Sequence, residues 1–596
     1  MRIRQRILAL AAAAALVSGV LVTGASGPAA AAPRGTGGTA SAHASAVNVR
    51  ALASRAGRAG PSTGSPPVAP TDGHGSSLPR RPTVGHRPGA VAGPAAVPAL
   101  APTVVTNFDG SDQTVCGSCQ PPDPNAATNG SQIVELVNAF FQVTDNNGAA
   151  LVECGGGVKL ASFLGTTDSL TDPRIQWDNV NQRFSFSVTL NPASSSATPA
   201  MWIAASQTAD PCGSWWVYRL TFSGGSFPAG TFLDFPMLGQ DRNALLISTR
   251  NFTHPGTNFA VFGVSKSLVY TGASVNFSTF SVPSLTAPVT NAGIPMVSSP
   301  VSFFLAAVPG TGYRLFRLTN SGGSGASLSQ TTISAPFNAP TRQANQPFTT
   351  STLDPSDGNI LWTPYYDGAS IWFTHDYDLA GFPTVRYGAV NVSANTVATA
   401  TAYHSGTSDD FDAALGIGLN PGGGVFVYLT WTYTDAPAGV AASDTVDGAL
   451  VTGGIPNLIA TGTVLVTGST TTETRFGDYS SVSVDPTVSG GGCAVVADQY
   501  FGTNAQWRTR IARVGSCQPQ PLAVVPNLAG DTTTQAASDL ATNGLRLGAV
   551  SSVTDPTCNN IGTVLSQNPA AGTQLPPGSS VNIVIGTMPP PPFQCP

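Results

Sequence analysis

One hairpin pattern recurs through the middle of this sequence and limits what the chain can fold into. Its clearest copy reads TDPRIQWD at residues 171–178, followed by RFSFSV at 183–188. Two short runs rich in β-branched and aromatic residues, joined by a tight polar turn, predict a β-hairpin. Weaker copies, most of them led by Asp or Gly, start near residues 123, 234, 293, 354, 412 and 478.

Repetition of this kind predicts a ring of small sheets. One hairpin cannot bury its own apolar face, so successive units must stack against one another and the ring must close. Seven copies predict a mainly β fold, a β-propeller over residues 103–519, with seven blades. Six blades and a pair of β-sandwiches are the alternatives. Only 10% of the residues are charged, with 65 Gly and 49 Pro, which favours many turns over long helices.

The composition of the two ends of the chain differs from that of the repeated middle region. Residues 1–32 begin with three arginines, continue with an apolar run and end in an Ala-rich cleavage pattern, which predicts a secretory signal peptide. Residues 33–102 are rich in Ala, Pro and Gly and poor in aromatics, which predicts a disordered tether. Residues 588–596 form a Pro-rich tail. We expect no membrane span, and the net charge of −5 argues against nucleic acid as a partner.

Eight cysteines in a chain with a secretory signal predict disulfides in an oxidising compartment. We expect Cys493 to pair with Cys517 and Cys558 with Cys595, because each pair closes a local loop. The CGSC stretch at residues 116–119 favours a structural bridge, with half a zinc site or a redox pair as the alternatives.

The C-terminal segment carries a more specific pattern. VPNLAG at residues 525–530 precedes the best helix pattern of the mature chain, with Asp531 or Thr532 placed to cap it. NGL at 543–545 and GTVLSQNPAAGTQLPPGSSV at 562–581 follow in order. Residues 522–587 therefore resemble a PASTA domain, a small α+β module. The resemblance implies a cell-wall-facing protein, with peptidoglycan or a muropeptide as the expected partner.

The middle region resembles the secreted, sialidase-like β-propellers of actinobacteria and other bacteria. The residues that carry this resemblance are the stretch at 172–178 and RFGDYS at 475–480. A sialidase uses a tyrosine nucleophile with an acidic partner, so Tyr479, Asp478 and Glu473 are the candidate catalytic residues. The alternative is a strand-start turn with a local ion pair.

The aspartates at the strand starts suggest a second chemistry. A ring brings them near its axis, where carboxylates and carbonyls could hold calcium. Asp409, Asp410 and Asp412 are the candidate ligands. The alternative is that each carboxylate caps its own turn. We expect no other cofactor.

These observations favour a secreted, extracellular or cell-wall-associated binding protein. Its propeller would present a ligand surface, and its PASTA module would contact peptidoglycan. The alternative is a glycan-active enzyme, a glycosidase or lyase, that the PASTA module directs to the wall. Whether the protein is an enzyme stays open here, with binding favoured over catalysis.

Overall fold

The computed structural model describes most of the chain from residue 39 onward. The described ranges are 39–56, 102–116, 119–151, 154–253, 256–291, 301–323, 325–420, 423–455, 462–472, 476–488, 491–517, 523–575 and 580–589. The expected signal peptide, most of the expected tether (residues 33–38 and 57–101), Glu473, Cys595 and most of the expected Pro-rich tail lie outside these ranges. None of the helices within them is long and apolar enough to cross a membrane.

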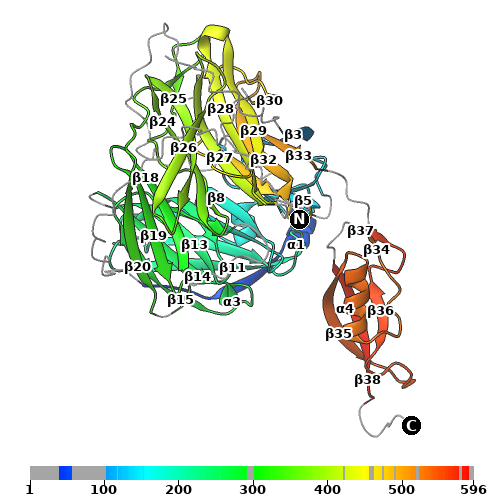
Figure 1. Cartoon of the computed structure of the whole chain (residues 1–596). Coiled ribbons are helices and arrows are strands. Elements are labelled where there is room, and N and C mark those ends of the chain that lie inside the picture. The colour runs from blue at the N-terminus through cyan, green and yellow to red at the C-terminus, as the bar shows by residue number, and fades with distance from the viewer. Residues whose placement is uncertain are drawn as a thin grey trace, which may run out of the picture.

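The described residues between 104 and 515 form seven mostly antiparallel units of four or five strands, which follow one another along most of the chain (Figure 1). We number them units 1 to 7. Unit 1 comprises β4 (Asn125–Thr128), β5 (Gln132–Val137), β6 (Phe140–Asp145) and β7 (Val158–Lys159). Unit 2 comprises β8 (Ser169–Asp178), β9 (Arg183–Asn191), β10 (Ala200–Ser206) and β11 (Ser214–Ser223). Unit 3 comprises β12 (Phe232–Gln240), β13 (Ala244–Phe252), β14 (Thr257–Ser265) and β15 (Val275–Val282).

The remaining units repeat this order. Unit 4 comprises β16 (Ala287–Pro288), β18 (Val301–Val308), β19 (Gly312–Thr319) and β20 (Ser327–Ser334). Unit 5 comprises β17 (Thr290–Asn291), β23 (Tyr365–Tyr366), β24 (Ser370–Leu379), β25 (Phe382–Asn391) and β26 (Thr396–Ala402). Unit 6 comprises β27 (Asp409–Leu419), β28 (Val425–Asp435), β29 (Val440–Val451) and β30 (Thr463–Val466). Unit 7 comprises β31 (Ser481–Val484), β32 (Cys493–Phe501), β33 (Trp507–Gly515) and β3 (Val104–Asp112).

The last unit takes its outer strand from the beginning of the propeller region. β3 pairs antiparallel with β33, so that Phe108 lies opposite Ile511. β31 of unit 7 in turn lies against β4 of unit 1. A ring of sheets is closed in this way because the chain must rejoin its own start to leave no free face. The prediction of a mainly β propeller is confirmed, and the number of blades stays a prediction.

Aromatic side chains fill the spaces between units. Between units 1 and 2, Phe163 from the short helix α2 (Leu160–Leu164) packs edge-to-face on Trp215 at 5.5 Å and on Phe186 at 5.3 Å between ring centroids. Trp215, Trp431 and Trp507 are fully buried. These tryptophans hold the units together, because an aromatic ring buries more apolar area than any aliphatic side chain.

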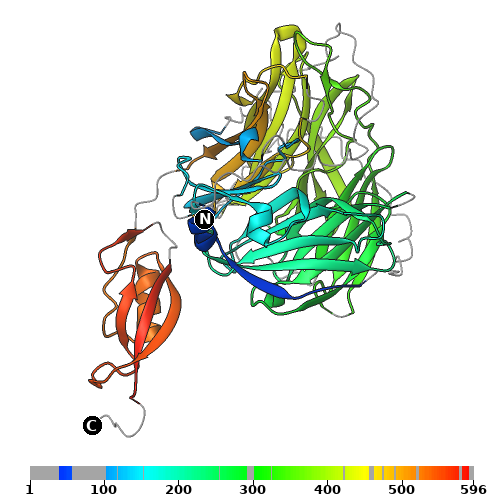
Figure 2. The same ribbon diagram turned by 180° about the vertical axis from the view of Figure 1, so that it is seen from behind.

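The N-terminal segment differs from the disordered tether that its composition predicts. Residues 39–56 form β1 (Thr39–Ala42), β2 (Ala44–Asn48) and the helix α1 (Val49–Ala56). β1 pairs with β11 on one side and β15 on the other, which joins units 2 and 3 into one ten-stranded sheet. Figure 2 shows this segment in blue along the propeller. Its small alanines fit between two sheet edges, and Val49 is fully buried.

Disulfides secure several loops. Bonds join Cys116 to Cys119, Cys154 to Cys212, and Cys493 to Cys517, the last being the pair expected from its spacing. Cys558 is also disulfide-bonded, while Cys595, its expected partner, lies outside the described residues. The prediction that the cysteines serve as disulfides is confirmed for the described part of the chain.

The C-terminal domain has its own small core. Thr532 caps α4 (Thr533–Thr542) in a reciprocal pair of hydrogen bonds with Gln535, as one of the two cap candidates predicts. The helix packs on a sheet of the order β35–β38–β36 (Figure 1). That sheet consists of β35 (Arg546–Thr554), β36 (Val564–Asn568) and β38 (Ser580–Thr587), and a separate two-stranded sheet pairs β34 (Ala523–Val524) with β37 (Gln574–Leu575).

The remaining short elements lie in loops of the propeller. They are η1 (Gln113–Val115), α3 (Lys266–Val269), β21 (Ala344–Asn345), β22 (Thr352–Leu353) and η3 (Ala436–Ala438).

Candidate functional site

The first strands of several units start with the same backbone distortion. Asp123, Asp172, Phe235 and Asp412 have positive φ angles of 51°, 57°, 52° and 54°. The pairing register of β8, β12 and β27 shifts at the last three of these positions. A bulge of this kind releases a backbone N–H from the sheet and redirects the neighbouring side chain. Asp tolerates the left-handed conformation better than most residues, which explains its recurrence here.

Side chains of neighbouring units accept the released N–H groups. The Asn138 side chain accepts from the Asp172 N–H at 2.7 Å, and the Asp172 carboxylate accepts from the Phe235 N–H at 3.1 Å. In the same way, Asp123 accepts from the Asp478 N–H at 3.0 Å. These carboxylates therefore join adjacent units rather than only capping their own turns.

An arginine and a tyrosine meet beside these bulges. The guanidinium carbon of Arg174 lies 3.3 Å from the ring centroid of Tyr479 and 5.6 Å from that of Phe235. Arg174 also donates from Nη2 to the Leu361 carbonyl at 3.2 Å. Burial lowers the pKa of Arg174 and raises that of Tyr479, while Asp172 and Asp123 favour the charged guanidinium. The cation–π contact and two nearby carboxylates stabilise a buried charge.

Four further carboxyl groups lie close by, on the side of units 5 to 7. The Asp376 carboxylate on β24 accepts from the Asp412 N–H at 3.0 Å. Burial raises the pKa of Asp376 to about 8, and burial together with the charge of Asp376 raises the pKa of Asp412 well above its usual value. Asp354 and Asp478 act on Asp412 by their charge, and both are partly exposed.

We call the set defined by these contacts the central cluster. It comprises Asp123, Asp172, Arg174, Asp354, Asp376, Asp412, Asp478 and Tyr479. Asp354 and Asp478 are partly exposed, whereas Asp376 and Asp412 are buried, and ionising both in a dry site is unfavourable. Oδ1 of Asp376 and Oδ2 of Asp412 accept no hydrogen bond from the described residues.

A second buried pair lies between units 6 and 7. Asp498 on β32 accepts from the Thr432 hydroxyl at 3.2 Å, and burial raises its pKa to about 8. Burial and the charge of Asp498 raise the pKa of Asp444, on β29, well above its usual value. Arg510 opposes this shift by its charge, and its guanidinium bonds to Asn107 and Asp109.

The candidate residues from the sequence have different outcomes. Tyr479, Asp478 and Asp412 belong to the central cluster, and Glu473 lies outside the described residues. Asp410 accepts from the Trp431 indole at 3.0 Å and the Ser408 hydroxyl at 2.7 Å. Asp409 accepts from the Asn345 N–H at 2.9 Å.

Metal binding finds no support in these contacts. Within the described ranges, no three His, Cys, Asp or Glu side chains are grouped to hold one metal ion. Calcium therefore stays an untested prediction.

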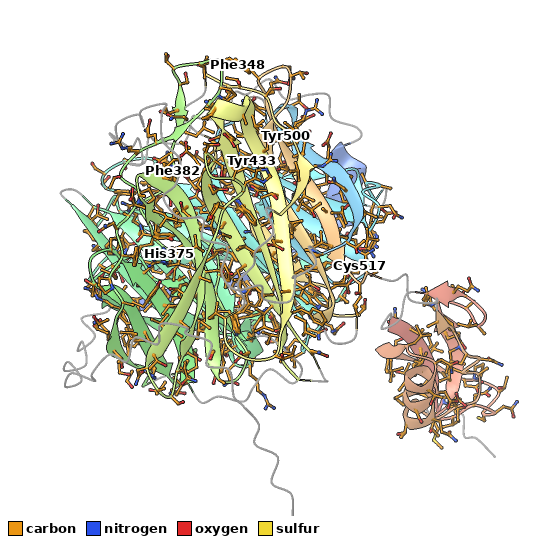
Figure 3. All side chains as sticks on the ribbon, turned by 45° about the horizontal axis from the view of Figure 1, so that its top comes forward. Phe348, His375, Phe382, Tyr433, Tyr500 and Cys517 are labelled. Atoms are coloured by element: carbon orange, nitrogen blue, oxygen red, sulfur yellow. A yellow bond between two sulfur atoms is a disulfide. The ribbon has the colours of Figure 1, made fainter. Side chains whose placement is uncertain are left out.

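The candidate residues expected from the sequence do not include Arg174 and Asp376. Arg174 follows the Asp-Pro pair of the clearest hairpin copy, so its position on a bulge was a usable signal. Asp376 follows His375, whose ring lies within 3.0 Å of the Tyr313 hydroxyl and whose pKa falls to about 3 through burial. Figure 3 labels this histidine inside the propeller. It is a neutral packing residue there and gives no sign of the acid beside it.

Comparisons with known proteins give one family match, and it covers a small part of the chain. Residues 523–587 match the PASTA domain family. No curated protein matches the chain.

Solved structures give only distant likenesses. An exo-β-1,3-galactanase from Phanerochaete chrysosporium is 11% identical with a TM-score of 0.25, over 70% of this chain and 99% of that one. The polysaccharide lyase Uly1 is 8% identical with a TM-score of 0.30, over 66% and 90%. The parainfluenza virus 5 haemagglutinin-neuraminidase ectodomain is 8% identical with a TM-score of 0.25, over 59% and 82%. These values transfer no activity. The described chain is a mainly β propeller followed by a PASTA domain.

Proposed function

We propose that this protein is a secreted, wall-associated glycan hydrolase that acts at the central cluster, with the PASTA domain holding it near peptidoglycan. The observation that carries the proposal is the difference between two kinds of carboxyl group at one place. Asp376 and Asp412 are buried with raised pKa values, and Asp354 and Asp478 are partly exposed beside them. The disulfides suit an oxidising, extracellular setting.

Cleavage of a glycosidic bond needs this combination of groups. One carboxylic acid must donate a proton to the leaving oxygen, while a second carboxylate attacks the sugar or activates water. Environments that push the pKa values of neighbouring acids apart assign these roles. Asp412 is our candidate for the proton donor and Asp478 for the carboxylate. Burial favours the protonated form of the Asp412 carboxyl, and the Asp376 carboxyl fixes the Asp412 backbone by accepting its N–H.

Substitution of Asp412 by Asn tests this assignment. Asn keeps the size of the side chain and removes the transferable proton, so turnover of a panel of wall glycans should fall by about a hundredfold or more. The matched control is Asp447→Asn on β29. Asp447 is also buried with its pKa raised to about 7, and no member of the central cluster contributes to that shift. Unchanged turnover in Asp412→Asn, or an equal loss in Asp447→Asn, would contradict the proposal.

A non-catalytic binding protein is the second candidate. The observation in its favour is burial, because Tyr479 is 1% exposed and Asp412 2%, which restricts contact with a substrate. This candidate predicts saturable binding of the same glycans with no turnover by the wild-type protein. Assaying binding and product release on one panel separates the two candidates.

A further inference from the structure

One large apolar side chain stands fully out of the propeller. Phe348 is 92% exposed, the highest value among the exposed large hydrophobic residues of the described chain. Its backbone φ is +59°, a conformation that bulky L-residues rarely adopt. Figure 3 shows it at the edge of the propeller. An exposed aromatic ring on a strained backbone needs a reason, and the usual reason is function.

The loop that carries Phe348 is firmly held. The Gln346 side chain donates to the Thr471 carbonyl at 3.0 Å and accepts from the Thr471 N–H at 3.0 Å. The Thr470 hydroxyl donates to the Pro347 carbonyl at 3.1 Å. Gln346 is buried. The two residues before Phe348 are therefore fixed to a segment far along the chain, so the ring is presented from a defined position.

The same loop is tied to the strand that carries the central cluster. The Asn345 N–H donates to the Asp409 carboxylate at 2.9 Å, and Asp409 begins β27, on which Asp412 lies. On its other side, the Phe348 ring leans toward the β28–β29 turn, where a Cβ built on Gly439 would lie 3.5 Å from the ring tip. Phe348 thus lies at the end of unit 6 where the Asp412 bulge starts.

The surroundings of the ring indicate what it contacts. Thr349, Thr350 and Ser351 follow it. The other exposed large hydrophobic residues described in the propeller are Val105, Val180, Leu450 and Val464, none in this loop. A protein partner or a membrane would need a contiguous apolar patch. A pyranose ring has one apolar face and a hydroxyl-rich edge, and it fits a single aromatic ring among hydroxyl groups.

We propose that Phe348 is a stacking platform for one sugar of an extended glycan chain whose scissile end reaches the central cluster. This inference rests on the proposed function and adds to it that the substrate is a polymer rather than a single sugar. The aromatic ring would contribute binding to long chains and nothing to short ones.

The test compares long and short ligands on the full-length protein. The probes are soluble peptidoglycan glycan strands and the disaccharide derived from them, titrated calorimetrically against the wild type, Phe348→Ala and Phe348→Tyr. Val180→Ala is the control, because Val180 is an exposed apolar residue just beyond the opposite end of β8 from Asp172. Phe348→Ala should weaken binding of the long strand by about tenfold, leave the disaccharide unchanged and leave the thermal midpoint intact. Phe348→Tyr should bind as the wild type does.

The outcomes separate this inference from the proposed hydrolase. Tight, Phe348-dependent binding without turnover supports the platform and contradicts the hydrolase. Turnover that depends on Asp412, with unchanged affinity of Phe348→Ala for long strands, contradicts the platform alone. If the wild type binds neither probe, both proposals fail for peptidoglycan glycans.

Discussion

Two parts of the propeller bury aspartate in opposite ways. Between units 2 and 3, Asp178 is fully buried and lies 2.6 Å from the Lys266 ammonium, which also donates to Gln240 at 2.8 Å. The Tyr270 hydroxyl donates to the same carboxylate at 2.9 Å. Although burial opposes ionisation, the charge and hydrogen bond of Lys266, together with hydrogen bonds from Asn181, leave the pKa of Asp178 below its usual value. This part of the ring neutralises its buried acid with a cation.

Units 5 to 7 bury more acid and supply less cation. Asp376, Asp412, Asp444 and Asp498 are all buried, and burial raises the pKa of each. Such groups are neutralised by protons instead. The Asp178–Lys266 site is therefore a closed structural network. The buried acids of units 5 to 7 instead keep exchangeable protons, and the partly exposed carboxyl groups beside them could accept those protons. This asymmetry is the physical basis of the proposed acid–base chemistry.

The largest expected effect comes from breaking the cation-neutralised site. Lys266→Met leaves the Asp178 carboxylate buried without its partner, which should lower the free energy of unfolding by about 3–5 kcal/mol. Adding Asp178→Asn to that variant removes the orphaned charge and should restore much of the loss. Urea unfolding measures both, with the exposed Lys159, whose side chain forms no ion pair with the described residues, replaced by Met as the control. A loss below about 1 kcal/mol would show that the network does not matter for folding.

The proton-neutralised site should respond in the opposite direction. Folding raises the pKa of Asp498 from about 4 in the unfolded chain to about 8. The folded protein therefore keeps a proton that the unfolded chain releases, and the free energy of unfolding falls as the pH rises through this window. Asp498→Asn removes the dependence, so relative to the wild type it should gain about 1.4 kcal/mol of stability for each pH unit between about 4 and about 8.

Thermal unfolding of Asp498→Asn and wild type across the pH range measures this effect. The control is Asp109→Asn, because Arg510 and Tyr500 bond to Asp109 and its pKa is lowered. Asp109→Asn should instead cost stability at neutral pH. Equal responses of the two variants would remove the distinction between the two kinds of site.

Some of this architecture could be predicted from local sequence, and the reason is physical. Residues close together in the chain determine three of its features: the Asp-led turns, the Cys493–Cys517 loop and the Thr532 cap. Arg174 meets Tyr479, and Asp376 meets Asp412, because particular units become neighbours in the ring. The spacing of residues along the sequence does not encode which units these are. The structure of residues 39–56 differs from the predicted tether for a related reason. Its alanines look like a tether until two sheet edges, supplied by β11 and β15, bury them.

The central claim, that buried carboxyl groups in units 5 to 7 carry protons at neutral pH, can be measured without knowing the substrate. Calorimetric unfolding at about pH 6, in buffers of different ionisation enthalpy, counts the protons exchanged. Asp376 and Asp498, with pKa values of about 8, and Asp447, at about 7, should each release one. His375 takes up part of a proton, since its folded pKa is about 3. We predict a net release of about two or more protons per chain, and about one fewer in Asp376→Asn. No net release, or net uptake, would contradict the account.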